Sequence, residues 1–115
     1  MANTFTKTTK SSLSTSDVTS SASTDVVTAG GTATLIVLSI LISNKIGTSA
    51  NANVYVVTTT GDDVFLIKNA PIPAGSSLEI ISGNKVIINS SDVIRASSDT
   101  SSALDIVVSY LQQTP

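Results

Sequence analysis

The side chains of this sequence that could take part in chemistry are a handful of carboxylates and hydroxyls. Glu79, Asp92, Asp99 and Asp105 could supply the paired carboxylates of a glycoside hydrolase, but their spacing selects no pair. Asp92 and Asp99 stand where turns commonly use an aspartate side chain. The chain has no histidine and no cysteine, which removes the commonest general base, the thiol nucleophile and the usual transition-metal ligands. We therefore expect a protein that is not an enzyme, with no catalytic, cofactor-binding or metal-binding residues.

Two other groups of residues have both a chemical and a structural interpretation. Asp62 and Asp63 beside Gly61 could contribute oxygen ligands to calcium, but no calcium-loop spacing follows and a turn explains them better. A serine activated by a lysine is the hydrolase type that remains without histidine. No Gly-x-Ser-x-Gly motif occurs, and the segment 82–85, Ser-Gly-Asn-Lys, has the composition of a turn. We expect both groups to be structural.

Charge and aromatic content limit the partners of the chain. Only 12% of its 115 residues are charged, the net charge is −2, and the six basic residues are scattered from Lys7 to Arg95. A nucleic-acid interface needs a basic stripe, and single-stranded binding needs stacked aromatic residues, of which the chain has only Phe5, Tyr55, Phe65 and Tyr110. We expect neither a nucleic acid nor a small-molecule substrate. So few charges suit a surface that neighbouring proteins cover.

One uncharged stretch, Val26–Asn44, raises the question of a membrane span. Its apolar centre, Leu35–Ile42, is eight residues long, whereas a spanning helix needs about 20 apolar residues. Glycine and threonine dilute the residues before it. The run is better explained as a buried strand, and we expect no membrane association.

The sequence from residue 25 onward has the pattern of short strands separated by turns. Serine and threonine make up 36 of the 115 residues, and the threonines add to many valines and isoleucines that favour extended backbone. Seven strands are predicted, over Thr32–Ser43, Ala52–Thr60, Val64–Lys68, Ser77–Ile81, Lys85–Asn89, Asp92–Ser97 and Ala103–Leu111. In the first of these, the even positions from Ile36 to Ile42 form a wholly apolar face. The prediction is an all-β fold: a small antiparallel β-sandwich or barrel, jelly-roll-like, with about seven or eight strands.

Two connections and an N-terminal segment complete the prediction. Ala70–Gly75 contains two prolines and should link two sheets, because proline cannot donate to a central ladder. Ser82–Asn84 should be the turn of a hairpin between the strands on either side. Residues 1–24 hold 14 serines and threonines and almost nothing large and apolar beyond Phe5 and Leu13. They are predicted to form an extended arm outside a sandwich domain of residues 25–115.

Two segments of the chain resemble a group of small virion structural proteins of tailed bacteriophages. These segments are Leu35–Gly47, LIVLSILISNKIG, and Pro71–Ile88, PIPAGSSLEIISGNKVII. The similarity continues through Asp92-Val93-Ile94, Ser98-Asp99-Thr100 and Leu104–Leu111, and covers roughly residues 33–112. The resemblance implies a place in a phage particle, without a defined task there and without catalytic residues.

The resemblance and the composition together predict a non-enzymatic virion protein that forms a symmetric homo-oligomer and binds other virion proteins. It would sit in the head–neck or tail connector region or on the head surface, after passing through the host cytoplasm. We expect five residues to contact other subunits: Phe5, Leu13, Leu35, Val37 and Leu41. A capsid cement or decoration protein is one alternative. A pilin-like filament subunit with a helical Leu35–Ile42 segment, and a small carbohydrate-binding sandwich, are others.

Overall fold

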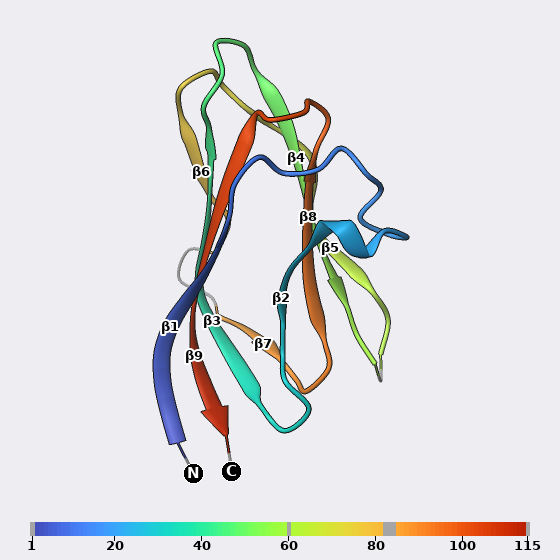
Figure 1. The fold of residues 1–115 in the computed structure, drawn as a ribbon, viewed down its shortest axis with the longest axis vertical. Helices are drawn as coiled ribbons and strands as arrows, with labels where there is room; N and C mark the ends of the chain where they lie inside the picture. The colour runs from blue at the N-terminus through green and yellow to red at the C-terminus, as the bar shows by residue number, and fades with distance from the viewer. Residues whose placement is uncertain (1, 60, 82–84, 115) are drawn as a thin grey trace.

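The computed structural model describes residues 2–59, 61–81 and 85–114. Two antiparallel sheets pack face to face and enclose one hydrophobic core (Figure 1). The elements, in chain order, are β1 (Ala2–Lys10), the short 3-10 helix η1 (Ala22–Thr24), β2 (Asp25–Thr28), β3 (Thr34–Asn44), β4 (Ala50–Val57), β5 (Val64–Ile72), β6 (Ser77–Glu79), β7 (Val86–Ile88), β8 (Val93–Ser98) and β9 (Leu104–Thr114). The prediction of an all-β sandwich is confirmed.

The connections follow the jelly-roll scheme. The five-stranded sheet has the order β1-β9-β3-β6, with β7 also paired to β3, and the four-stranded sheet has the order β2-β8-β4-β5. Only the β4–β5 hairpin and the step from β6 to β7 stay within one sheet, and all other connections cross between the sheets. The first and last strands lie side by side, so the two chain ends meet at one end of the molecule (Figure 1). Such crossing connections are typical of jelly rolls.

The N-terminal segment belongs to the sandwich. β1 pairs with β9 over its whole length, from Ala2 opposite Thr114 to Lys10 opposite Ile106. Residues 11–24, which we call the strap, then cross the end of the sandwich, where the Leu13 N–H bonds the Leu104 carbonyl at 2.8 Å. The predicted extended arm is therefore not confirmed, because residues 2–24 form an edge strand and a strap of the same domain.

The β3 strand changes the direction of its side chains halfway along. Its buried positions are Leu35 and Val37 in the first half but Ile40 and Ile42 in the second. The register with β9 shifts between Val37 and Ser39, which is the mark of a β-bulge, and Leu38 is the extra residue. The prediction that the even positions form one continuous face is wrong for the first half of the strand.

Two details of the connections also differ from the sequence prediction. β6 and β7 do not pair with each other: both pair with β3, at Leu41–Ser43 and at Leu35–Val37, and so form one interrupted edge strand. The predicted hairpin is therefore wrong, and its turn, Ser82–Asn84, lies outside the described residues. The connection between sheets near the prolines is confirmed, but β5 continues through Pro71 to Ile72 before it crosses. Pro71 is tolerated because β5 is an edge strand.

Candidate functional site

An apolar row runs across the outer face of the five-stranded sheet. Residues that stand opposite each other in neighbouring strands share a face, and here the pairs are Phe5 with Leu111, Leu111 with Ile36, and Ile36 with Ile87. Phe5 is 76% exposed and Ile87 60% exposed, while Leu111 and Ile36 between them are half-buried. We call these four residues, one from each of β1, β9, β3 and β7, the outer apolar row.

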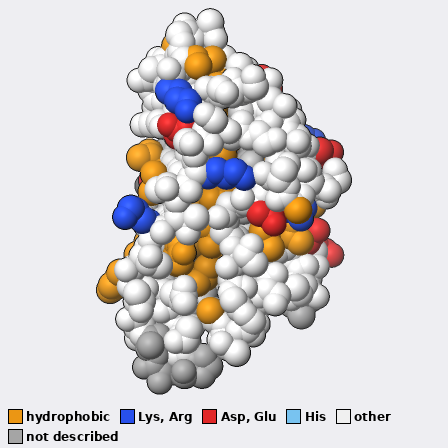
Figure 2. Space-filling view, viewed as in Figure 1, with side chains coloured by type: hydrophobic (Ala, Val, Ile, Leu, Met, Phe, Trp, Pro, Cys, Tyr) orange, Lys and Arg blue, Asp and Glu red, His pale blue; other side chains and the backbone are white. Residues whose placement is uncertain are grey.

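A second pair of apolar residues extends this surface along the strands. Leu41 of β3 is 39% exposed and stands opposite Val107 of β9. Leu41, Val107 and the four residues of the outer apolar row lie apart from the hydrophobic residues that pack against the core. In Figure 2, hydrophobic side chains reach the left-hand margin of the molecule, on the side of this sheet. This face therefore presents two apolar groups, separated by Ser39 and Ser109, that nothing else in the described chain covers.

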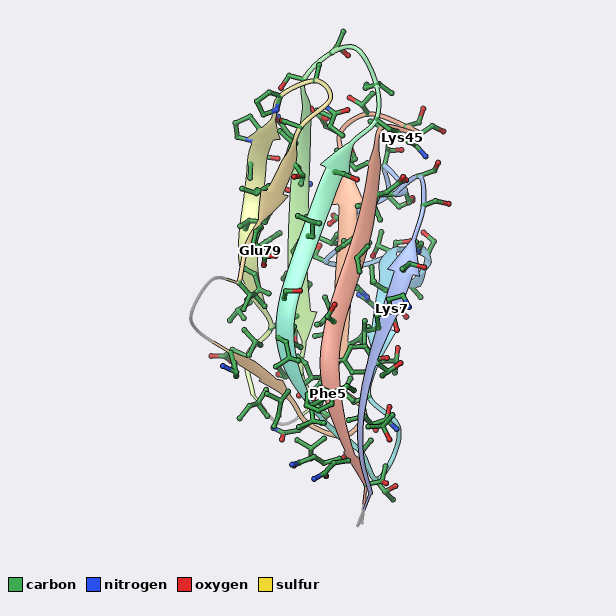
Figure 3. The ribbon with its side chains drawn as sticks, turned by 90° about the vertical axis from the view of Figure 1, so that its left-hand side faces the viewer. Phe5, Lys7, Lys45 and Glu79 are labelled. Carbon is green, nitrogen blue, oxygen red and sulfur yellow. The ribbon has the colours of Figure 1, made fainter. Side chains whose placement is uncertain are left out.

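The charged groups of this face lie around the apolar residues. Figure 3 looks onto the sheet and shows Phe5 and Lys7 on the β1 side, Glu79 on the β6 side and Lys45 near one end. Glu79 Oε1 accepts hydrogen bonds from the backbone N–H groups of Ile40 and Ile81, at 3.2 and 3.0 Å. Its carboxylate thus adds to the main-chain pairing where β6 ends, beside the bond from the Ile80 N–H to the Ile40 carbonyl. The face combines apolar groups with polar residues around and between them, and protein–protein interfaces likewise mix apolar and polar surface.

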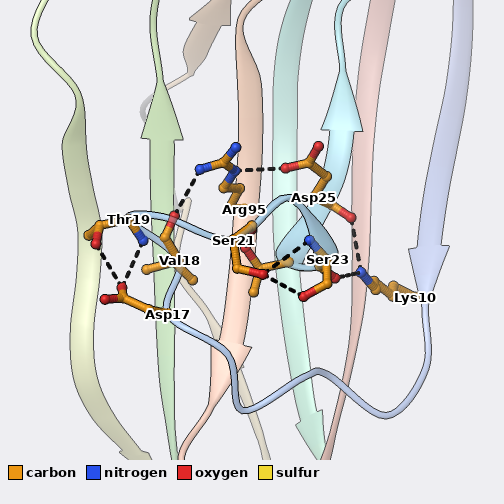
Figure 4. Close-up of polar contacts among 9 residues, drawn as sticks. Lys10, Asp17, Val18, Thr19, Ser21, Ser23, Asp25 and Arg95 are labelled. Atoms are coloured by element: carbon orange, nitrogen blue, oxygen red, sulfur yellow. Dashed lines mark hydrogen bonds and ion pairs between the residues drawn. The ribbon is translucent and has the colours of Figure 1, made fainter.

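The opposite outer face, on the four-stranded sheet, is partly covered by the strap. Val18 of the strap is 3% exposed, and its carbonyl accepts a hydrogen bond from Arg95 of β8 at 3.3 Å. Arg95 also pairs with Asp25 at 2.7 Å, and Lys10 Nζ bonds the Ser23 carbonyl at 2.7 Å (Figure 4). Within the described residues, the strap therefore covers part of one outer face, and the other outer face stays bare.

A polar cavity of about 240 Å³ lies between the strap and the four-stranded sheet, with Asp17, Asn53, Phe65 and Lys68 among its lining residues. Hydrogen bonds from the backbone N–H and the hydroxyl of Thr19 hold the pKa of Asp17 below its usual value. The Phe65 ring contacts Tyr55, with centroids 4.8 Å apart, and lies 5.2 Å from the Lys68 ammonium. The cavity has room for a small polar molecule, but Phe65 is its sole aromatic lining residue. It does not form the aromatic platform of a carbohydrate site.

One serine–lysine contact occurs at the end of the five-stranded sheet. Lys45 Nζ donates to Ser12 Oγ at 2.8 Å and pairs with Asp105 at 2.9 Å, while the Ser12 N–H donates to Asp105 at 2.8 Å. The Ser12 N–H and the Lys45 ammonium lower the pKa of Asp105. An ammonium that is paired with a carboxylate donates hydrogen bonds but has no lone pair to accept the serine proton. The cluster therefore fastens the strap to β3 and β9, and its geometry is not that of an activated nucleophile.

The other carboxylates considered above bond backbone groups of separate turns. Asp92 is 5% exposed and accepts from the N–H groups of Thr59 and Asn89, at 3.1 Å each. Asp99 accepts from the Asn51 N–H at 2.9 Å, and Asp63 from the Thr58 N–H at 2.9 Å. Within the described residues, no three acidic side chains gather into a metal-binding group, and no helix is long and apolar enough to cross a membrane.

The five predicted contact residues divide into two groups. Leu13, Leu35 and Val37 are at most 2% exposed and lie in the core of the chain itself, so the prediction that they contact other subunits is wrong. Phe5 and Leu41 lie on the bare outer face. The sequence reasoning missed Ile36, Ile87 and Leu111 as surface residues. The one signal for them was that several strands carry apolar residues at successive positions, which leaves some of these residues outside a single core.

The comparisons with known proteins add no relative. No protein-family model matches the chain, and no significant match was found among curated proteins or solved structures.

Proposed function

We propose that this chain is a non-enzymatic structural protein of a tailed-phage particle, where it packs as a symmetric oligomer against copies of itself and other virion proteins. Its position would be the head–neck or tail connector region or the head surface. A capsid cement or decoration protein is the alternative role. The proposal joins the resemblance of residues 33–112 to phage virion proteins with the character of the bare outer face.

The single observation that carries the proposal is the exposure of the outer apolar row. Phe5 and Ile87 are 76% and 60% exposed at its two ends, on a face that the described part of the chain leaves uncovered. Burying each such side chain against a neighbour would contribute about 1.5–3 kcal/mol. Contiguous apolar surface of this kind marks interaction sites in soluble proteins. We take the occupant to be the neighbouring subunits of the particle.

The architecture is compatible with this proposal by analogy. Jelly rolls recur in viral capsid proteins, although they also occur in lectins, so the fold alone assigns no task. A pilin-like subunit is disfavoured, because Leu35–Ile42 lies within strand β3 and not in a helix. The carbohydrate-binding alternative is disfavoured by the single aromatic residue that lines the cavity.

The test compares two sets of surface variants in the phage that encodes the chain. Leu41→Thr combined with Ile87→Thr removes apolar surface from the bare face, and Val64→Thr, at a residue 47% exposed on the other sheet, is the matched control. We expect purified particles to contain the wild-type chain and the Val64→Thr chain. We expect the double variant to be missing from particles, although the purified variant has the same circular dichroism spectrum as the wild-type chain. Absence of the wild-type chain from purified particles, or normal incorporation of the double variant, would overturn the proposal.

A further inference from the structure

Three of the four sheet edges carry features that discourage pairing with another strand. β5 contains Pro71 and has two register shifts against β4. β2 has only four residues and a register shift against β8, and the β6/β7 edge consists of two pieces of three residues each. Proline, bulges and short edge strands are the features by which natural sheets avoid adding a further strand.

β1 forms the fourth edge and has a different character. It runs for nine residues in unbroken register with β9, without proline and without a bulge. Its C-terminal end is crowded by the strap and by the start of β2, where Lys10 Nζ bonds the carbonyls of Ser23 and Asp25, at 2.7 and 3.1 Å. The sequence that follows Ala2, Asn-Thr-Phe-Thr-Lys-Thr-Thr, is rich in threonine, which favours strands. β1 is thus a long, regular edge with one side of its backbone unpaired by any strand of the described sheets.

We infer that β1 pairs antiparallel with β1 of a second copy across a two-fold axis, with Phe5 opposite Phe5. This register uses residues 2–8 and avoids the crowded end at Lys10. It places Lys7 opposite Asn3, so no like charges oppose each other. It also places the two phenyl rings as a cross-strand aromatic pair, which is a favourable neighbour in sheets.

The pairing explains why the most exposed large apolar side chain lies on an edge strand. Phe5 stands opposite Leu111 on its β9 side, and the two-fold axis would supply a second ring on its open side. The rows of both copies would then run as one apolar band across a continuous sheet. This inference deepens the proposed function and rests on it for its biological setting, because it names one contact within the oligomer.

The test uses a single introduced thiol, which is possible because the chain has no cysteine of its own. Directly opposed residues of antiparallel strands have Cα atoms about 4.5–5.5 Å apart, within the range that a disulfide spans. Under mild oxidation of the purified protein, Phe5→Cys should convert almost completely to a covalent dimer. Ile87→Cys, which is also exposed (60%, against 76% for Phe5) but lies on the opposite edge, should form no covalent dimer. A mixture of Asn3→Cys and Lys7→Cys should yield the mixed dimer in preference to either homodimer.

Each outcome bears on the inference. Equal cross-linking of Phe5→Cys and Ile87→Cys, or a wild-type chain that sediments as a monomer at its highest soluble concentration, would overturn it. Homodimers of Lys7→Cys as the main product would refute the register. If the purified chain dimerises in this way but is absent from phage particles, the proposed function fails and the inference stands. If the chain is in particles but Phe5→Cys does not cross-link, the inference fails alone.

Discussion

Leu13 gives the sharpest test of whether the N-terminal segment is part of the domain. The Leu13 side chain is 1% exposed in the core, and its N–H bonds the Leu104 carbonyl at 2.8 Å. The next residue, Ser14, accepts a hydrogen bond from the Ser98 N–H at 3.0 Å. The strap is therefore attached to the ends of β9 and β8, which belong to different sheets. Replacing Leu13 with alanine should loosen this junction.

The size of the effect follows from what the substitution removes. Leu13→Ala deletes three buried carbon groups, worth about 2.4 kcal/mol at about 0.8 kcal/mol per group. The cavity left behind adds to this, so the free energy of unfolding should fall by about 3 kcal/mol, within the range of about 2–5 kcal/mol for buried leucines. This is a large part of the stability of a small domain, about 5–15 kcal/mol. If residues 1–24 were a detached arm, the loss would be near zero.

Equilibrium urea unfolding followed by circular dichroism measures this change. Wild type, Leu13→Ala and the exposed control Val64→Ala should be compared at one protein concentration, because dimerisation would make stability depend on concentration. Val64→Ala should cost less than about 1 kcal/mol. A Leu13→Ala midpoint that matches the control would refute the structural role of the strap.

Three further predictions concern single features of the fold. Gly75 has φ +69°, so Gly75→Ala should lower the free energy of unfolding in urea by about 1–2 kcal/mol. Gly31 has open space around it and no positive φ, so Gly31→Ala should not lower it. Equal effects of the two substitutions would contradict the backbone argument. The pKa of Asp105 is lowered in the folded chain, so this residue stabilises the fold above its unfolded pKa near 3.8 and stops doing so as the pH falls below that pKa. In thermal melts, Asp105→Asn should therefore make the melting temperature depend less on acid pH. An unchanged pH profile would refute this. Arg95→Met should lower the free energy of unfolding by about 1–3 kcal/mol. The Arg95 and Asp25 side chains are 2.7 Å apart, so a double-mutant cycle with Asp25→Asn should show strong coupling. Additive effects would show that the pair contributes little.

The positions of most strands could be predicted from alternation and turn residues. All seven predicted strands occur, although their bounds shift by up to a few residues. The β3 bulge could not be predicted, because LIVLSILI is apolar on both faces and gives no sign of where the buried face changes. This ambiguity led to the assignment of Leu35 and Val37 to the surface.

The extended arm expected at the N-terminus is not confirmed, for a different physical reason. Its serine- and threonine-rich composition indicated that it could not offset its own ordering entropy. In the structure, main-chain pairing with β9 and two buried apolar anchors, Leu13 and Val18, hold it in place. Threonine also favours strands, so composition alone did not distinguish a free arm from an edge strand. The outer apolar row could not be predicted, because the register of the strands decides which residues are cross-strand neighbours. A single sequence does not reveal that register.

Hydroxyl-radical footprinting of the chain, free and within purified phage particles, tests the central claim most directly. Phe5 lies on the bare outer face and Phe65 on the other sheet, so the two phenyl rings serve as probe and internal reference. The account predicts that Phe5 is oxidised much more slowly in particles than in the free chain diluted until it is monomeric, with Phe65 less affected. Equal oxidation of Phe5 in both states would show that the bare face stays uncovered, and would contradict the account.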